Sequence, residues 1–208
     1  MMPNNDPLPP HSNGSITDWL VHDDVADRRA DALVVAANTQ LEMVGSGAAA
    51  LLARGGIEIH REAVAHAPAK LGSVVRTRAV RLSAPYIYHA VVIDHDARKD
   101  VWVGDIVVAL RGVLACALTD GVRTLAMPLL GVRAGGLGVR DSLEAILEAI
   151  EDVSTAYTWN VVVEIVAKAV NEFVEAAEVF REYAARAARE ADEAQFAAEF
   201  LKLLLRKQ

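Results

Sequence analysis

The chain of 208 residues is poor in several residue types, and each shortage excludes a class of protein. Cys116 is the only cysteine, so there is neither a disulfide framework nor a thiolate zinc cluster, and we expect this side chain to lie in the core. Lysine and arginine number 21 against 28 acidic residues, which gives a formal net charge of −7. This charge argues against general binding of nucleic acid or anionic membranes, although it allows a local site for one small anion.

Long apolar runs are also missing. The most apolar stretch, residues 105–121, is interrupted by Arg111 and is too short to span a bilayer. Residues 1–15, MMPNNDPLPPHSNGS, have no basic region followed by an apolar segment, so we interpret them as a flexible tail and not as a secretory signal. We therefore expect a cytoplasmic protein without membrane contact.

Apolar residues, in contrast, make up 53% of the chain, enough for one sizeable core. Strand-like runs alternate with helical patterns, which predicts a layered α/β domain. Two adjacent strand-like runs suggest a hairpin or neighbouring strands, so we expect a mixed sheet. The expected strands are residues 18–22, 31–37, 73–82, 86–93, 123–130 and 160–169, and the expected helices are about 47–66, 104–119, 139–153 and a long one from 171 onward.

The last helical pattern contains a narrow apolar seam with an unbroken four-three spacing. Two interpretations are open. The first half of this helix packs on the sheet while its end extends or folds back, or the helix mediates self-association through its closely spaced alanines. The seam positions are Phe173, Ala177, Phe180, Ala184, Ala187, Ala191, Ala194, Ala198, Leu201 and Leu205.

Two glycine-rich loops each follow an expected strand and lead into a helix. The first is NTQLEMVGSGAAALLA, residues 38–53, and the second is PLLGVRAGGLGVRDSLEAI, residues 128–146. Backbone N–H groups in such loops, together with the positive end of the helix dipole, form anion sites. Either loop alone would be a weak indication of such a site, but the pair suggests a diphosphate held from both sides.

Two common nucleotide-binding motifs do not explain these loops. Residues 45–50, GSGAAA, match the dinucleotide pattern, but seven residues separate them from the strand, and the region 20 residues later is helical. Neither loop ends in Gly-Lys-Ser/Thr, so a P-loop is excluded.

The loops and their flanking strands resemble the macrodomain family. DALVVAANTQLEMVGSGAAALLARGG, residues 31–56, is similar to the signature in which an apolar strand runs into Asn-Ala-Ala-Asn and a glycine loop. The resemblance continues through residues 72–92 and 123–150, GSVVRTRAVRLSAPYIYHAVV and RTLAMPLLGVRAGGLGVRDSLEAILEAI. It covers residues 16–180 and implies a three-layer α/β/α fold with a mixed central sheet, followed by a C-terminal helical extension over residues 181–208.

Macrodomains bind ADP-ribose, so the resemblance implies ADP-ribose or an ADP-ribosylated macromolecule as partner. Asp24, followed by Val25, stands where the family has an aspartate that accepts from the adenine amino group. Asn38 stands where an asparagine contacts the distal ribose. A plain turn role for Asp24 and a capping role for Asn38 are the alternatives. The residues matching the two diphosphate loops are Gly45, Ser46 and Gly47, and Gly131, Val132, Arg133, Ala134, Gly135 and Gly136.

Two departures from the family concern catalysis. Ala48 stands where hydrolytic members have an acidic residue, and alanine can neither position water nor take a proton. Val35 replaces the first asparagine of the signature. We therefore expect a binding module without MacroD-type hydrolysis. A hydrolase acting on ADP-ribosylated protein or on acyl or phospho ADP-ribose is the first alternative, and a degenerate, non-binding macrodomain used for self-association is the second.

Further departures concern the cleft. Val44 and Arg133 replace usual glycines, and the Arg133 guanidinium would pair with the diphosphate, fill the cleft or point to solvent. Lys168, near the end of the last strand, offers no ring for stacking on adenine. His89 matches a common family position, and we expect a satisfied core or edge histidine. The adjacent side chains of residues 94–96 have poor geometry for a metal, so we expect neither a metal nor a cofactor.

Overall fold

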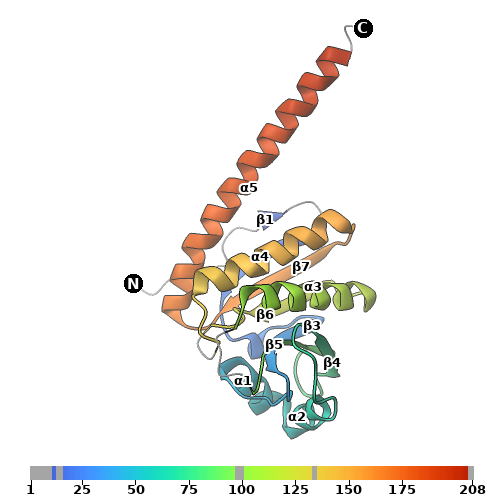
Figure 1. Ribbon diagram of the computed structural model, residues 1–208, viewed down its shortest axis with the longest axis vertical. Coiled ribbons are helices and arrows are strands. Elements are labelled where there is room, and N and C mark those ends of the chain that lie inside the picture. Colours follow the sequence, from blue (N-terminus) through green and yellow to red (C-terminus); the bar gives the residue numbers. More distant parts are fainter. Residues whose placement is uncertain (1–10, 13–15, 97–100, 133–134, 206–208) are drawn as a thin grey trace.

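The computed structural model describes residues 11–12, 16–96, 101–132 and 135–205. A seven-stranded mixed sheet, in the order β1-β2-β7-β6-β3-β5-β4, lies between two helical layers (Figure 1). The fold is therefore the three-layer α/β/α arrangement with a mixed sheet that the sequence predicts. The strands are β1 His11–Ser12, β2 Ile16–His22, β3 Ala32–Asn38, β4 Val74–Arg78, β5 Tyr86–Ile93, β6 Thr124–Pro128 and β7 Val161–Ala167. The helices are η1 Val25–Asp27, α1 Ser46–Gly55, α2 Ile57–Val64, α3 Val103–Thr119, α4 Val139–Ala156 and α5 Val170–Leu205.

The strand directions place one end of the sheet in a special position. The five inner strands β2, β7, β6, β3 and β5 are parallel, whereas β1 and β4 pair antiparallel at the two edges. The antiparallel β4–β5 pair confirms the neighbouring strands expected between residues 73 and 93. From β3 the chain proceeds outward to the edge strand β4 and to β5 beside it, then returns across β3 to β6 and continues to β7 on the other side. The order thus reverses between β3 and β6, and open α/β sheets bind ligands at the carboxyl ends of strands at such a switch point.

The two sheet faces have separate apolar cores, as the alternation of side chains along a strand requires. Along β3, Ala32 and Val34 pack into the larger core under α3, α4 and the start of α5. Leu33 and Val35 point to the opposite face, where a smaller core lies under η1, α1 and α2. Cys116 on α3 is partly buried against the larger core, in agreement with the core role expected from the sequence.

The segment expected to be one helix over residues 47–66 forms two helices, α1 and α2, in the structure. Gly56 ends α1 with a φ of +85° and directly precedes α2. A residue with a Cβ disfavours that backbone conformation, which is why the chain turns at a glycine. Periodicity alone missed the break because apolar residues recur at helical spacing on both sides of it.

Helix α5 begins in the core and then leaves it (Figure 1). Phe173, Ala177 and Phe180 of the seam are buried, Ala184 and Ala187 are half-buried, and the described side chains beyond them are exposed. The first half therefore packs against α4, β2 and β7, while the second half extends from the domain as a continuous helix. The boundary that the sequence suggested at residue 181 falls inside this helix. No helix in the described part of the chain is long and apolar enough to cross a membrane.

His89 on β5 is a buried core histidine, as the sequence suggested. Its ring Nε2 lies 2.9 Å from Thr77 Oγ1 on β4, and the residue is 1% exposed. Burial, reinforced by the charge of His66 and opposed by that of Glu62, lowers the pKa of His89 from 6.5 to about 4. The imidazole is therefore neutral in the folded protein at pH 7.

The neutral imidazole makes stability depend on pH. Between pH 6.5 and about 4 the unfolded chain binds a proton at this position and the folded chain does not, so stability falls as pH falls through that window. We expect the contribution of His89 to reach about 3 kcal/mol. Urea unfolding at pH 7 and pH 4.5 should show a smaller loss in His89→Gln, which keeps a hydrogen-bonding group beside Thr77 without the titration. Equal losses in the two proteins would contradict the assignment.

Candidate functional site

A cleft of about 280 Å³ opens at the carboxyl ends of the parallel strands, at the switch point between β3 and β6. Its walls come from five segments of the chain that are far apart in sequence. Asp23 to Val25 follow β2, Val44 to Ala48 follow β3, and Ile93 ends β5. Pro128, Leu129, Gly131, Val132 and Gly135 come from the end of β6 and the loop after it, and Lys168 follows β7. The topology thus brings together residues that the sequence separates by more than 140 positions.

The first glycine loop forms the N-terminus of α1 at this cleft. Gly45 is the N-cap with a φ of +87°, and no side chain in the described part of the protein caps the first-turn N–H groups. Gly45, Ser46 and Gly47 all line the cleft. A Cβ added at Gly47 would meet only Pro128 Cγ, at 4.0 Å, so the backbone here faces open space. Uncapped N–H groups at a helix N-terminus are suited to an anion.

The second glycine loop follows β6 and lines the same cleft. Gly131, Val132 and Gly135 line the cleft. Gly131 O accepts from Leu137 N at 3.1 Å, which closes the loop on itself. Gly136 is described but does not line the cleft, whereas Arg133 and Ala134 lie outside the described residues.

Asn38, at the end of β3, lines the cleft and also organises the first loop. Its Oδ1 accepts from the N–H groups of Gln40 and Glu42, at 3.1 and 3.0 Å. Its Nδ2 donates to Glu42 Oε2 at 3.2 Å, and the same oxygen lies 3.4 Å from His95 Nδ1. The capping role suggested by the sequence is therefore present, and the amide is held in one orientation beside the cleft.

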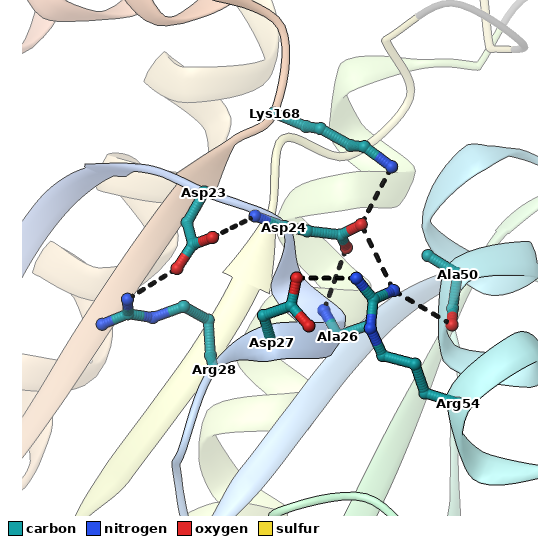
Figure 2. Close-up of polar contacts among 8 residues, drawn as sticks. All are labelled: Asp23, Asp24, Ala26, Asp27, Arg28, Ala50, Arg54 and Lys168. Carbon is teal, nitrogen blue, oxygen red and sulfur yellow. Dashed lines mark hydrogen bonds and ion pairs between the residues drawn. The ribbon is translucent and has the colours of Figure 1, made fainter. Parts of the chain in front are cut away.

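Asp24 stands at the other end of the cleft, where three donors converge on its carboxylate (Figure 2). Its Oδ1 caps η1 by accepting from Ala26 N at 3.1 Å. Its Oδ2 lies 2.9 Å from Lys168 Nζ and 3.4 Å from Arg54 Nη1. Burial alone would raise the pKa of Asp24, but the hydrogen bonds from Lys168 and Ala26 and the charges of Lys168 and Arg54 outweigh it and hold the pKa below its usual value. Asp24 is thus an ionised acceptor at neutral pH.

A second ion-pair group fixes the segment that carries Asp24 (Figure 2). Arg28 binds both carboxylate oxygens of Glu164 on β7, at 2.7 and 2.8 Å, and Asp23 Oδ2 at 2.9 Å. Asp23 Oδ1 in turn accepts from Asp24 N at 2.8 Å. These half-buried contacts tie the loop after β2 to the central sheet and set the position of Asp24.

The departures noted in the sequence have clear structural positions. Ala48 and Val35 line the cleft but are otherwise buried, at 3% and 2% exposure, so the start of α1 presents a methyl group and not an acid to the cleft at this position. Val44 also lines the cleft, and its side chain is largely exposed at the rim. The cleft remains open despite this Cβ.

Among the described residues, no group of three or more His, Cys, Asp and Glu side chains could hold a metal ion. Within the 94–96 segment, Asp94 Oδ1 accepts from Asp96 N at 3.1 Å, and His95 turns toward Glu42. These side chains therefore serve local hydrogen bonds in the loop after β5.

Sequence reasoning missed two cations at the Asp24 end. Lys168 was considered only for the aromatic ring that it lacks, and Arg54, on α1, was not considered. No local pattern marks either residue, because each reaches Asp24 through the fold and lies 30 or more positions away. Pro128 and Ile93, which line the apolar wall, were likewise read only as strand residues.

Comparisons with known proteins agree with this geometry. The macro domain family profile matches residues 34–146. An uncharacterized protein of Mycobacterium tuberculosis is 33% identical over 150 residues, which are 69% of this chain and 41% of the relative. The chain thus spans about two fifths of the length of that relative.

Two solved structures share the fold. The Oceanobacillus iheyensis macrodomain with ADP superposes with a TM-score of 0.73 at 17% identity, covering 85% of this chain and 96% of the other. The Trypanosoma brucei macrodomain in complex with ADP-ribose gives a TM-score of 0.69 at 19% identity, covering 77% and 68%. The profile match and the fold together lead to one assignment: this chain belongs to the macro domain family.

Proposed function

We propose that this chain binds ADP-ribose, or a macromolecule carrying it, in the cleft between β3 and β6. The observation that carries the proposal is that two glycine loops, one of them an uncapped helix N-terminus, line the same cleft. A diphosphate needs several N–H donors close to its oxygens, and glycine backbones allow that approach. The macrodomains of O. iheyensis and T. brucei, described with ADP and ADP-ribose, are consistent with this ligand class.

The ligand would lie along the cleft with its two halves at opposite ends. Asp24 and Val25 would read adenine, since an ionised carboxylate accepts from the exocyclic amino group. Asn38 would contact the distal ribose with the amide that Glu42 holds in place. The diphosphate would lie between the loops, against Gly45, Ser46 and Gly47 on one side and the residues 131–136 loop on the other.

A melting experiment tests the proposal, because a ligand that binds only the folded state must raise its stability. At a concentration of about 100 times the dissociation constant, the gain is about 2.7 kcal/mol, which corresponds to roughly 5 to 10 °C in a chain of this size. We expect such a shift with ADP-ribose and a smaller one with AMP, which lacks the second phosphate and the distal ribose. No shift with ADP-ribose at millimolar concentration would refute the proposal.

The absence of an acid at Ala48 supports a binding module without MacroD-type hydrolysis. One observation favours the hydrolase alternative: Glu42 Oε2 contacts both Asn38 and His95 beside the distal-ribose end. A carboxylate beside Asn38 would be a candidate for a general base.

Incubation with an ADP-ribosylated protein separates the two proposals. We expect no release of ADP-ribose by the wild-type chain, and therefore no difference between it and Glu42→Gln. Glutamine keeps an acceptor for Asn38 Nδ2 but cannot take a proton. Release by the wild type that disappears in Glu42→Gln would establish the hydrolase instead, with Glu42 as its base.

Self-association through α5 is the remaining alternative, favoured by the exposed second half of that helix. A stop after Ala187 keeps every described α5 side chain that is buried, including Tyr183. Light scattering on this truncated chain and on the full chain tests this alternative. The same number of chains per particle in both proteins would eliminate self-association through α5.

A further inference from the structure

The Asp24 end of the cleft offers two kinds of hydrogen-bonding group side by side (Figure 2). Asp24 is an acceptor, and Lys168, whose Nζ lies 2.9 Å from Asp24 Oδ2, is a donor with three N–H bonds. Both residues line the cleft. A ligand that reaches this corner therefore meets a carboxylate and an ammonium group together.

Purine bases differ in the order of donor and acceptor along the edge that such a pair would read. Adenine presents its 6-amino donor beside the N1 acceptor, whereas a 6-oxopurine presents the O6 acceptor beside the N1–H donor. A carboxylate combined with a fixed backbone N–H fits only the adenine order. A mobile ammonium beside such a pair allows the other order as well, because the carboxylate can accept from N1–H while the ammonium donates to O6.

Lys168 has the freedom that this requires. Its side chain is 55% exposed, whereas that of Asp24 is only 12% exposed. If the ammonium turns toward a base, Asp24 keeps the Ala26 N–H and the Arg54 guanidinium as partners. Arg54 is less free to follow it, because its guanidinium also contacts Asp27 Oδ2 at 2.6 Å and Ala50 O at 3.5 Å. One cation thus fixes the carboxylate, and the other is available to the ligand.

We propose that Lys168 is a specificity-determining residue that allows this cleft to bind 6-oxopurine diphosphate riboses as well as ADP-ribose. This inference rests on the proposed function, since it assigns the base to the Asp24 end. Asp24 accepts the N1–H of the 6-oxopurine, and Lys168 donates to O6. For adenine, Asp24 accepts from the amino group and N1 accepts from the backbone N–H of Val25, which also lines the cleft, so adenine does not depend on Lys168.

The test compares inosine diphosphate ribose with ADP-ribose by calorimetry on the same proteins. The ratio of the two affinities is the useful quantity, because any effect of the Lys168 charge on the diphosphate is common to both ligands. We expect the wild-type chain to bind the two within about threefold of each other. In Lys168→Met the affinity for inosine diphosphate ribose should fall at least roughly tenfold relative to the affinity for ADP-ribose. This is the usual effect of losing a hydrogen bond from a charged donor.

Two variants control the interpretation. Lys168→Gln retains an N–H donor and should bind the inosine ligand better than Lys168→Met does. Lys70→Met makes the same chemical change at an exposed lysine that does not line the cleft, and it should leave both affinities unchanged. The melting temperatures of all variants without ligand report whether each is folded.

The outcomes separate this inference from the proposed function. Tight binding of ADP-ribose with rejection of the inosine ligand by roughly 100-fold would overturn the role of Lys168 alone. An equal loss for both ligands in Lys168→Met would also overturn it, since Lys168 would then act on the common diphosphate. If neither ligand binds, the proposed function fails and the inference fails with it.

Discussion

Replacing Gly47 by leucine is expected to abolish ADP-ribose binding while leaving the protein folded. A Cβ at this position meets nothing closer than 4.0 Å, so the added side chain projects into the cleft and does not collide with the core. Gly47 lies in the first turn of α1, where leucine also has the higher helix propensity, by up to about 0.8 kcal/mol. We expect a loss of more than about 2.7 kcal/mol in binding, which is roughly 100-fold or more in affinity.

The matched control is Ala49→Leu on the same helix. Ala49 is exposed and does not line the cleft, so this variant adds a similar side chain outside the site. Calorimetry with ADP-ribose and a melting scan without ligand should be made on both variants. Undiminished binding by Gly47→Leu would show that the ligand does not pass along the first glycine loop.

Removing the carboxylate in Asp24→Ala is expected to weaken ADP-ribose binding by roughly 10- to 100-fold, the usual effect of losing a hydrogen bond to a charged group. The substitution leaves Lys168 and Arg54 without their shared partner and removes the cap of η1. We therefore expect a modest loss of stability as well, about 1 kcal/mol, which is typical of a lost N-cap.

Asp27→Ala is the control for the ion pairs. Asp27 binds Arg54 at 2.6 Å, but its side chain is 49% exposed and does not line the cleft. Affinity should stay within about threefold of the wild type, since an exposed ion pair contributes little. Equal losses of affinity in the Asp24 and Asp27 variants would mean that Asp24 acts only by supporting the loop after β2 and does not contact the ligand.

The sequence was sufficient for those parts of the site that depend on local backbone chemistry. The glycine loops at 45–47 and 131–136 are identified by their composition and by their position after strands. The fold brings the two loops to one cleft. Asn38 was singled out by the macrodomain signature at the end of an apolar strand. The structure has its capping role, whereas its contact with the distal ribose stays a prediction.

Side chains that act at a distance were beyond sequence reasoning. Lys168 follows β7, and the parallel pairing of β2 with β7 brings it to Asp24. Arg54 is on α1, and the packing of α1 against η1 brings it there. The interpretation of Lys168 as a position without a stacking ring was incomplete, because it did not consider the ion pair that the Lys168 ammonium forms with Asp24.

The course of the long C-terminal helix also had to come from the structure. A four-three spacing continues from Phe173 to Ala198 without a change in pattern, yet Phe173 and Phe180 are buried while Ala191 and Ala198 are exposed. Apolar periodicity reports which face of a helix is suited to packing, but not where its packing partners end. In this chain they end near Tyr183, the last buried residue described in the helix.

The most direct measurement is a calorimetric titration of the wild-type chain with ADP-ribose, repeated on Gly47→Leu. We predict saturable binding of one ADP-ribose per chain by the wild type and no measurable heat of binding by Gly47→Leu at the same concentrations. Absence of binding by a folded wild-type chain, or equal binding by the two proteins, would contradict the assignment of the cleft between β3 and β6 as the ADP-ribose site.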